Sequence, residues 1–335
     1  MKTFAMVILV QICVVGTLLA QSKTGTTVGQ FLLIEPSARA AGMGNAGVSM
    51  YEDILSAYYN PAAIGQFTNY GVQATHSLWL ADIAYDYVGV AVHTDSWGNL
   101  YASLTSLNSG EIDVTTVSQP LGTGERYTVN DMAMGIGYGA QISDRFSAGV
   151  EVSYVQETIW HSSLTAFALN VGTIYRISPD GLRLGASISN FGTQAKYAGR
   201  DLYISYDQNT SISGDNSALP GEVQTGDFFL PIVFRIGISY PWKIDNSNKL
   251  QLALDAFHPN ENTESMSIGG EWSFRNTFMV RAGYQNLFQQ DSETGLALGT
   301  GVLYDGGGYD IHLDYAWSEY GRLQNVQRFS VGISF

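Results

Sequence analysis

Apolar residues alternate with small or polar ones along most of this 335-residue chain, and this pattern constrains the fold more than any other feature. In one stretch, Phe146, Val150 and Val152 alternate with Ser147 and Glu151. A period of two residues is that of a β-strand, whose successive side chains point to opposite faces. The sequence therefore predicts an all-β protein in which one face of each strand is apolar.

The alternation predicts fourteen antiparallel strands joined by two kinds of connection. Short turns such as 143–144 and 275–276 alternate with longer connections, of which 108–126 and 192–229 are the longest. Short turns at one rim and long loops at the other are typical of outer-membrane β-barrels. The expected strands are 69–79, 84–93, 98–107, 127–139, 145–157, 163–176, 181–191, 230–240, 248–257, 265–274, 277–285, 295–304, 309–318 and 327–335.

Two interpretations of the alternation differ in where the apolar faces point. In a soluble β-sandwich they are buried between two sheets, whereas in a membrane barrel they face lipid while small or polar residues face the lumen. The alternation of Phe329, Val331 and Ile333 continues to Phe335, the last residue. A final strand ending on an aromatic residue is the signal expected by the barrel-assembly machinery. We therefore expect a transmembrane barrel whose two ends both lie at the short-turn, periplasmic rim.

The composition narrows the possible partners. The chain carries 16 Lys and Arg against 30 Asp and Glu, a formal net charge of −14. Such a charge repels the phosphates that dominate nucleic-acid binding, so nucleic acid is not expected as a partner. Beyond the N-terminus, no apolar run approaches the ~20 residues of a membrane-spanning helix. An apolar content of 45% excludes a disordered chain.

The first twenty residues have the pattern of a secretory signal peptide. Lys2 is followed by an apolar run that ends at Ala20, after which the chain becomes polar. Cleavage after Ala20 would remove Cys13, the only cysteine, and would leave no disulfide or zinc–thiolate site in the mature protein. The alternative is an uncleaved N-terminal anchor. We expect residues 1–20 to direct export to the outer membrane of a Gram-negative-type bacterium.

Residues 21–66 form a separate segment ahead of the barrel, which we expect over 67–335. From residue 30 onward this segment does not alternate like a strand. Its small residues, and the lack of an amphipathic stripe, suit a plug packed inside the lumen. Asp53 is a candidate N-cap for a short helix that ends before Pro61.

Seven short motifs occur in order along the chain: Phe-Leu-Leu-Ile at 31–34, Ala-Arg-Ala-Ala-Gly-Met-Gly at 38–44, Tyr-Asn-Pro-Ala at 59–62, Asp-Ala-Phe-His-Pro at 255–259, Arg-Ala-Gly-Tyr at 281–284, Asp-Tyr-Ala at 314–316 and Arg-Phe-Ser-Val-Gly-Ile-Ser-Phe at 328–335. Together they resemble the PorV/PorQ family, which belongs among the fatty-acid-transporter-like (FadL-type) outer-membrane barrels. The resemblance implies a fourteen-stranded barrel with an N-terminal plug, in which Arg39, Gly42, Gly44, Asn60 and Pro61 are structural. In that family, PorV receives exported proteins of the type IX secretion system by their C-terminal domain.

Candidate catalytic and metal-binding residues form no strong pattern. His161 and Ser163 have the spacing of a base and a nucleophile on one strand face, but they lie in a predicted turn and no third residue can be named. The five histidines lack metal-ligand spacing. The acids within 201–227 are expected either to bind calcium or to keep the loop solvated. We expect a non-enzymatic protein without a cofactor or a metal.

Tyrosines at the strand ends are expected in the aromatic girdles of the two membrane interfaces, together with Tyr58 and Tyr59. These strand-end residues are Tyr70, Tyr87, Tyr154, Tyr175, Tyr240 and Tyr304.

The leading hypothesis is an outer-membrane protein that binds secreted cargo and a secretion translocon through its outward loops. Loop 192–229 is the expected contact, since loops beyond about 12–15 residues are usually functional or disordered, although it could simply cover the barrel mouth. The alternative is FadL-like passive transport of hydrophobic small molecules, which needs an apolar pocket beside the plug. A third and weaker hypothesis is a lipid-modifying enzyme using His161.

Overall fold

In the computed structural model, fourteen long antiparallel strands form a closed barrel. The structure describes residues 24–94, 97–178, 181–212, 214, 218–289 and 291–335. The predicted signal peptide, with Cys13, lies outside these residues, as do Asp215 and parts of two predicted turns. No helix among the described residues combines the length and the apolar character needed to cross a membrane.

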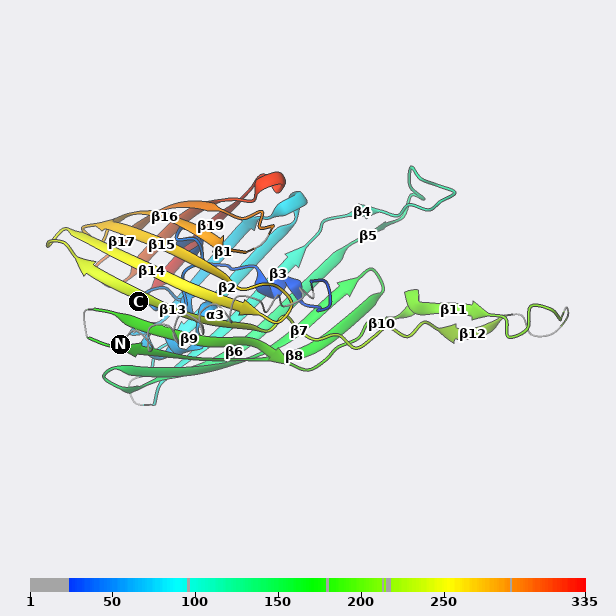
Figure 1. Cartoon of the computed structure of the whole chain (residues 1–335), viewed down its shortest axis with the longest axis horizontal. Helices are drawn as coiled ribbons and strands as arrows, with labels where there is room; N and C mark the ends of the chain where they lie inside the picture. Colours follow the sequence, from blue (N-terminus) through cyan, green and yellow to red (C-terminus); the bar gives the residue numbers. More distant parts are fainter. Residues whose placement is uncertain (1–23, 95–96, 179–180, 213, 215–217, 290) are drawn as a thin grey trace, which may run out of the picture.

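The barrel strands follow one another around the wall in chain order, and the first and the last pair to close it (Figure 1). These strands are β1 Gly71–Leu78, β2 Ala84–Val92, β3 Asn99–Asn108, β6 Val129–Ser143, β7 Phe146–Ile159, β8 Ser162–Arg176, β9 Arg183–Gly192, β13 Val233–Lys243, β14 Asn248–Pro259, β15 Ser265–Phe274, β16 Phe278–Leu287, β17 Leu296–Asp305, β18 Asp310–Glu319 and β19 Asn325–Ser334. The shorter elements are η2 Gln30–Leu33, α2 Ala38–Gly42, α3 Ser56–Tyr59, η3 Pro61–Gln66, η4 Leu80–Asp82, β4 Ile112–Asp113, β5 Arg126–Tyr127, β10 Ala198–Gly199, η5 Arg200–Leu202, β11 Tyr203–Tyr206, β12 Leu219–Glu222 and η6 Gly321–Leu323.

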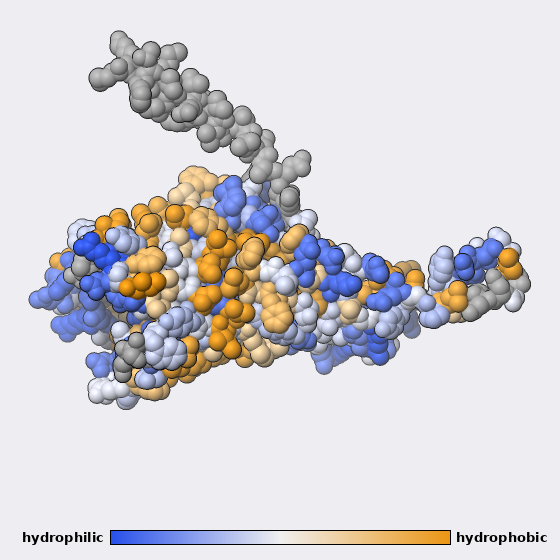
Figure 2. Space-filling view, turned by 90° about the horizontal axis from the view of Figure 1, so that it is seen from below, coloured by the Kyte–Doolittle hydropathy of each residue, from blue (hydrophilic) through white to orange (hydrophobic). Residues whose placement is uncertain are grey.

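The apolar faces of the strands point outward. On β13, Phe234 and Ile236 are 40% and 42% exposed, whereas Arg235 between them is 3% exposed. Figure 2 shows hydrophobic residues gathered over the barrel wall and hydrophilic residues toward its two ends. An exposed apolar belt is stable only in contact with lipid, so the transmembrane-barrel prediction is confirmed and the sandwich interpretation is wrong.

Aromatic residues gather on the outer wall at the short-turn rim. Tyr70 stacks on Phe335 with ring centroids 6.4 Å apart, and the strand-end Tyr175, Tyr240 and Tyr304 are also exposed. The girdle prediction is wrong for Tyr58, Tyr59 and Tyr87. Their side chains pack together inside the barrel, because Tyr87 occupies an inward-facing position of β2 and the other two belong to the N-terminal segment.

Two long connections fold into hairpins that extend beyond the barrel, at the end opposite the short turns (Figure 1). Strand β4 pairs with β5, and β11 pairs with β12 from Tyr203 opposite Glu222 to Tyr206 opposite Leu219. The sequence analysis predicts long loops at these places but no strands within them. The rim that carries the hairpins is called the long-loop rim below, and the opposite one the short-turn rim.

The described chain begins and ends at opposite rims. Thr24 donates a hydrogen bond to the backbone oxygen of Glu261, which lies between β14 and β15 at the long-loop rim (3.4 Å). Phe335 lies at the short-turn rim. The two ends of the barrel itself share the short-turn rim, where Gly71 lies opposite Ser334, as expected for an even number of strands.

Candidate functional site

Residues 28–67 lie inside the barrel and touch its wall on several sides. The wall is formed by glycine at many of the points of contact: Gly172 faces Asn60, and Gly149 faces Pro61, so closely that any side chain at these glycines would overlap the segment. The small inward-facing residues that alternate with apolar ones in the sequence thus make room for the segment.

Asn60 ties the segment to the barrel wall. Its side chain is fully buried, and its Nδ2 donates to the backbone oxygens of Val48 (2.8 Å) and Thr173 (3.0 Å). Its Oδ1 accepts a hydrogen bond from the backbone N–H of Ala62 (3.0 Å), which caps η3. Pro61 begins η3, where a missing N–H has no consequence. A short helix ends before Pro61 as predicted, although Asp53 lies two residues ahead of its N-cap position.

Gly42 and Gly44 bring the segment against β16 and β17. A Cβ atom on Gly42 would lie 2.9 Å from the Cα of Gly299, and one on Gly44 would lie 2.8 Å from the backbone nitrogen of Tyr284. Gly44 also has a φ of 64°, in the left-handed region that favours glycine. Any larger residue at either position would push the segment away from the wall.

A buried cluster of charged residues joins the segment to three barrel strands. Arg39 donates to both carboxylate oxygens of Glu271, at 2.9 Å from Nε and 2.7 Å from Nη2. Arg281 donates from Nε to Glu271 and from Nη1 to Asp314, both at 2.6 Å. We call these four residues the ion cluster. Arg39 is predicted from the sequence as a structural residue. Arg281 and Asp314 belong to two of the sequence motifs without an assigned role, and Glu271 belongs to none, because only folding brings β15, β16 and β18 to the same arginine.

A second buried charged group lies beside Glu35, between η2 and α2. Its carboxylate lies 3.8 Å from Arg235 on β13, and Arg328 on β19 donates to the Glu35 backbone oxygen (3.1 Å). Burial raises the pKa of the Glu35 carboxyl to about 7, although Arg235 and Arg328 act to lower it.

The interior toward the long-loop rim is packed with apolar side chains. Val28, Phe31 and Ile34 of the segment contribute to one buried cluster with Leu164 of β8 and with Leu230 just before β13. The N-terminal segment thus fills this half of the barrel with its own apolar residues.

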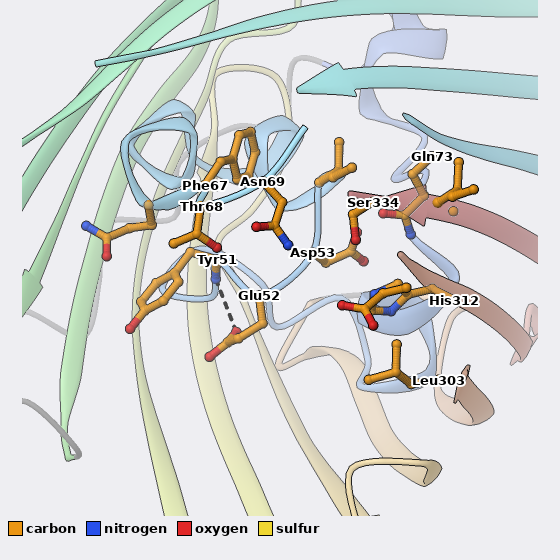
Figure 3. A pocket seen from close by; sticks show the side chains of 15 residues that line it. Tyr51, Glu52, Asp53, Phe67, Thr68, Asn69, Gln73, Leu303, His312 and Ser334 are labelled. Atoms are coloured by element: carbon orange, nitrogen blue, oxygen red, sulfur yellow. Dashed lines mark hydrogen bonds between the residues drawn. The ribbon is translucent and has the colours of Figure 1, made fainter. Parts of the chain in front are cut away.

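The interior at the short-turn rim is open and is lined by charged, polar and apolar side chains. One cavity of about 370 Å³ lies between the segment and β1, β17, β18 and β19. Figure 3 shows Gln73 and His312 of the wall on one side of this cavity and Tyr51 and Glu52 of the segment on the other. An adjoining cavity of about 700 Å³ shares Glu52 and His312 and continues toward β8, β9, β13 and β14.

The β11–β12 hairpin exposes apolar side chains beyond the barrel. Tyr203, Ile204 and Tyr206 are 66%, 45% and 54% exposed. The connection between β4 and β5 similarly exposes Val117 and Leu121 almost completely. Large apolar side chains that project into water are typical of surfaces that bind another protein.

His161 fastens the base of the longest loop to the β7–β8 turn. Its Nδ1 lies 3.0 Å from Oδ1 of Asp201, and Arg200 contacts its Nε2. Asp201 also accepts a hydrogen bond from the His161 backbone N–H (3.0 Å). Both ring nitrogens thus contact the loop rather than Ser163, which gives this histidine a structural part. Among the described residues, no group of three or more His, Cys, Asp or Glu side chains could hold a metal ion.

Comparison with protein-family models matches residues 18–214, more than half of the chain, to the family described as "Type IX secretion system protein PorV". Comparison with curated protein sequences gives no significant match.

Several solved structures have a similar barrel. The Pseudomonas putida toluene transporter TodX is 14% identical with a TM-score of 0.57, over 89% of this chain and 96% of that chain. The Ralstonia pickettii toluene transporter TbuX is 12% identical with a TM-score of 0.54, over 88% and 96%. A Pseudomonas aeruginosa FadL homologue is 12% identical with a TM-score of 0.50, over 90% and 98%. At these identities the similarity shows the fold alone.

Proposed function

This chain belongs to the PorV family of type IX secretion system proteins, and we propose that it binds secreted proteins and their translocon through its long-loop rim. It is a β-barrel of the outer membrane. The observation that supports this function is the β11–β12 hairpin, where Tyr203, Ile204 and Tyr206 are exposed beyond the barrel. Binding would be reversible docking, with no bond chemistry.

We further propose that residues 24–66 plug the barrel, with the short-turn rim facing the periplasm and the long-loop rim facing outward. The contacts of Asn60 with β8, and the ion cluster between Arg39 and β15, β16 and β18, support the plug. A plugged barrel would offer its outer rim as a platform and keep its lumen closed to solutes.

Deleting the β11–β12 hairpin is expected to reduce client binding at least tenfold while the barrel still folds. The excision joins Leu202 to Val223, whose backbones are already hydrogen-bonded (2.8 Å). A matched control removes residues 115–124 from the connection between β4 and β5, beyond the hydrogen bond that the Val114 backbone N–H donates to the Glu125 backbone oxygen. Binding is measured by co-purification of secreted proteins, and folding by heat-modifiable mobility. Unchanged binding of every client after the β11–β12 deletion would contradict the proposal.

The alternative function, passive transport of hydrophobic small molecules, rests on the fold that the chain shares with the hydrocarbon channels. The cavities described inside the barrel argue against it, since the charged side chains of Glu52 and Asp53 line both of them, beside apolar residues. At the long-loop rim, Phe31 and Ile34 occupy the space that an apolar ligand would need. Toluene uptake into proteoliposomes at the rate of empty vesicles would eliminate this alternative.

Removing Phe335 is expected to lower the amount of assembled barrel several-fold. Phe335 exchanges two backbone hydrogen bonds with Tyr70 (2.9 and 3.1 Å) and stacks on its ring, so it completes the seam that closes the barrel. We propose that it is also the signal read by the assembly machinery. Quantifying protease-resistant protein in outer-membrane fractions tests this. Phe335→Tyr, which keeps the ring, is the control and should assemble normally, and a fully assembled deletion variant would refute the role.

A further inference from the structure

An unbalanced group of cations lies inside the barrel at the short-turn rim. Arg176, Arg183, Lys243 and Lys249 line the cavity of about 700 Å³. They come from β8, β9, β13 and β14, which are consecutive around the wall. All four belong to the inward-facing rows of their strands, next to the short turns. We call this group the basic vestibule.

The register of the strands places these cations in two pairs of like charge. Arg176 lies directly opposite Arg183 between β8 and β9, and Lys243 lies directly opposite Lys249 between β13 and β14. Like charges directly opposite each other destabilise a sheet. Two such pairs on neighbouring strand pairs therefore indicate a place where negative charge from another molecule would be stabilising.

Among the described residues, the carboxylates of the same cavity balance only one of these four cations, Arg183. Glu271 and Asp314 are engaged in the ion cluster, and Glu52 contacts Arg183. Asp53 accepts hydrogen bonds from Ser37 and from a backbone N–H. The cavity is thus lined by six Arg and Lys against four Asp and Glu, in a chain whose overall ratio is 16 to 30.

The lysine side chains and two buried donor atoms of the vestibule have no partner among the described residues. The backbones of Lys243 and Lys249 pair between β13 and β14, but their ammonium groups make no hydrogen bond or ion pair with any described residue. Nε of Arg183 and Nε2 of Gln251 are also buried, and neither has an acceptor among the described residues. Both side chains line the cavity. Arg183 and Gln251 are 7% and 8% exposed. A buried donor without an acceptor destabilises the fold, and an oxyanion at the cavity wall would supply the missing acceptor.

We propose that the basic vestibule binds a polyanionic solute with at least two phosphate or carboxylate groups, which enters from the short-turn rim. Neighbouring strands are about 4.8 Å apart, so the cations on β8 and β14 are on the order of 14 Å apart, beyond the reach of one monovalent anion. The lysines nearest the mouth hold the solute. Gln251 and the Nε of Arg183, whose Nη1 stays with Glu52, donate to its oxygens once their side chains turn toward the cavity. This site does not depend on client binding at the opposite rim.

The test measures binding of sodium pyrophosphate and, separately, of sodium citrate to the purified mature protein in non-ionic detergent, by calorimetry at physiological ionic strength. The wild-type protein is expected to bind at least one of these probes, and the preferred probe distinguishes phosphate from carboxylate recognition. The double variant Lys243→Gln/Lys249→Gln is expected to bind it at least tenfold more weakly. Sodium chloride at equal ionic strength is the monovalent comparison.

The matched control is Arg145→Gln/Arg275→Gln, which removes the same charge from two short turns outside the cavity lining and should leave the affinity unchanged. Gln251→Leu removes a buried donor without changing charge and should weaken binding several-fold. Absence of binding by the wild-type protein at millimolar probe would overturn the site. Equal binding by the wild-type protein and the lysine double variant would overturn it as well.

Discussion

Replacement of Glu271 by glutamine is expected to lower the free energy of unfolding of the barrel by about 3–5 kcal/mol. The Glu271 carboxylate accepts hydrogen bonds from both Arg39 and Arg281, and its side chain is only 8% exposed. Glutamine keeps the size of the side chain but removes its charge. Two buried guanidinium groups would then face each other, with Asp314 bonded to Arg281 and Glu52 at 3.8 Å from Arg39 as partial compensation.

Urea unfolding of the protein in lipid vesicles, followed by tryptophan fluorescence, measures this loss. The control is Glu264→Gln, because Glu264 is an exposed carboxylate between β14 and β15 and its replacement should change stability by no more than about 0.5 kcal/mol. The double variant Arg39→Gln/Glu271→Gln removes one cation with the anion. It should be less destabilised than the sum of its single substitutions, since Arg281 keeps Asp314. Strict additivity would show that the residues of the cluster do not act together.

The fold could be predicted from the sequence because a membrane barrel imposes the same rule on every strand. Lipid outside and a packed segment inside force the alternation that is visible, for instance, in Phe234, Arg235 and Ile236, and this alternation locates all fourteen barrel strands. The hairpins beyond the barrel follow no such rule. Strands β11 and β12 are four residues each; β11 is exposed at every residue and β12 has no buried residue, so no apolar face of a core or a membrane marks them in the sequence.

The interior was only partly predictable. Arg39, Gly42, Gly44, Asn60 and Pro61 lie in continuous motifs, and the structure places them where the segment meets the wall or turns beside it. Their partners Glu271, Arg281 and Asp314 are far away in sequence, and only barrel closure and register bring them together. The route of the segment was also not predictable, because no periodicity shows that Thr24 begins at the long-loop rim.

Substituting valine for Gly269 is expected to release the N-terminal segment from the wall and open the barrel. Gly269 faces inward on β15, and a Cβ atom there would overlap the backbone of Met43 in the segment. Backbone cannot move aside as a flexible side chain can. Overpacking of this kind costs about 1–3 kcal/mol, which would raise the open population by about 5–150-fold.

The neighbouring Gly270 provides a matched control, because it occupies the same strand and faces outward. A Cβ atom there meets its nearest neighbour, a methyl group of Leu252, at 3.4 Å, an ordinary contact distance. Gly270→Val therefore makes the same change in strand propensity without touching the segment. Conductance in planar bilayers should rise for Gly269→Val and stay at the wild-type level for Gly270→Val. Protease should cleave residues 24–66 faster in the first variant only. If protease cleaves the segment faster in Gly269→Val but the two variants conduct equally, wall and segment separate without opening a path. That result would mean that the segment does not close the lumen.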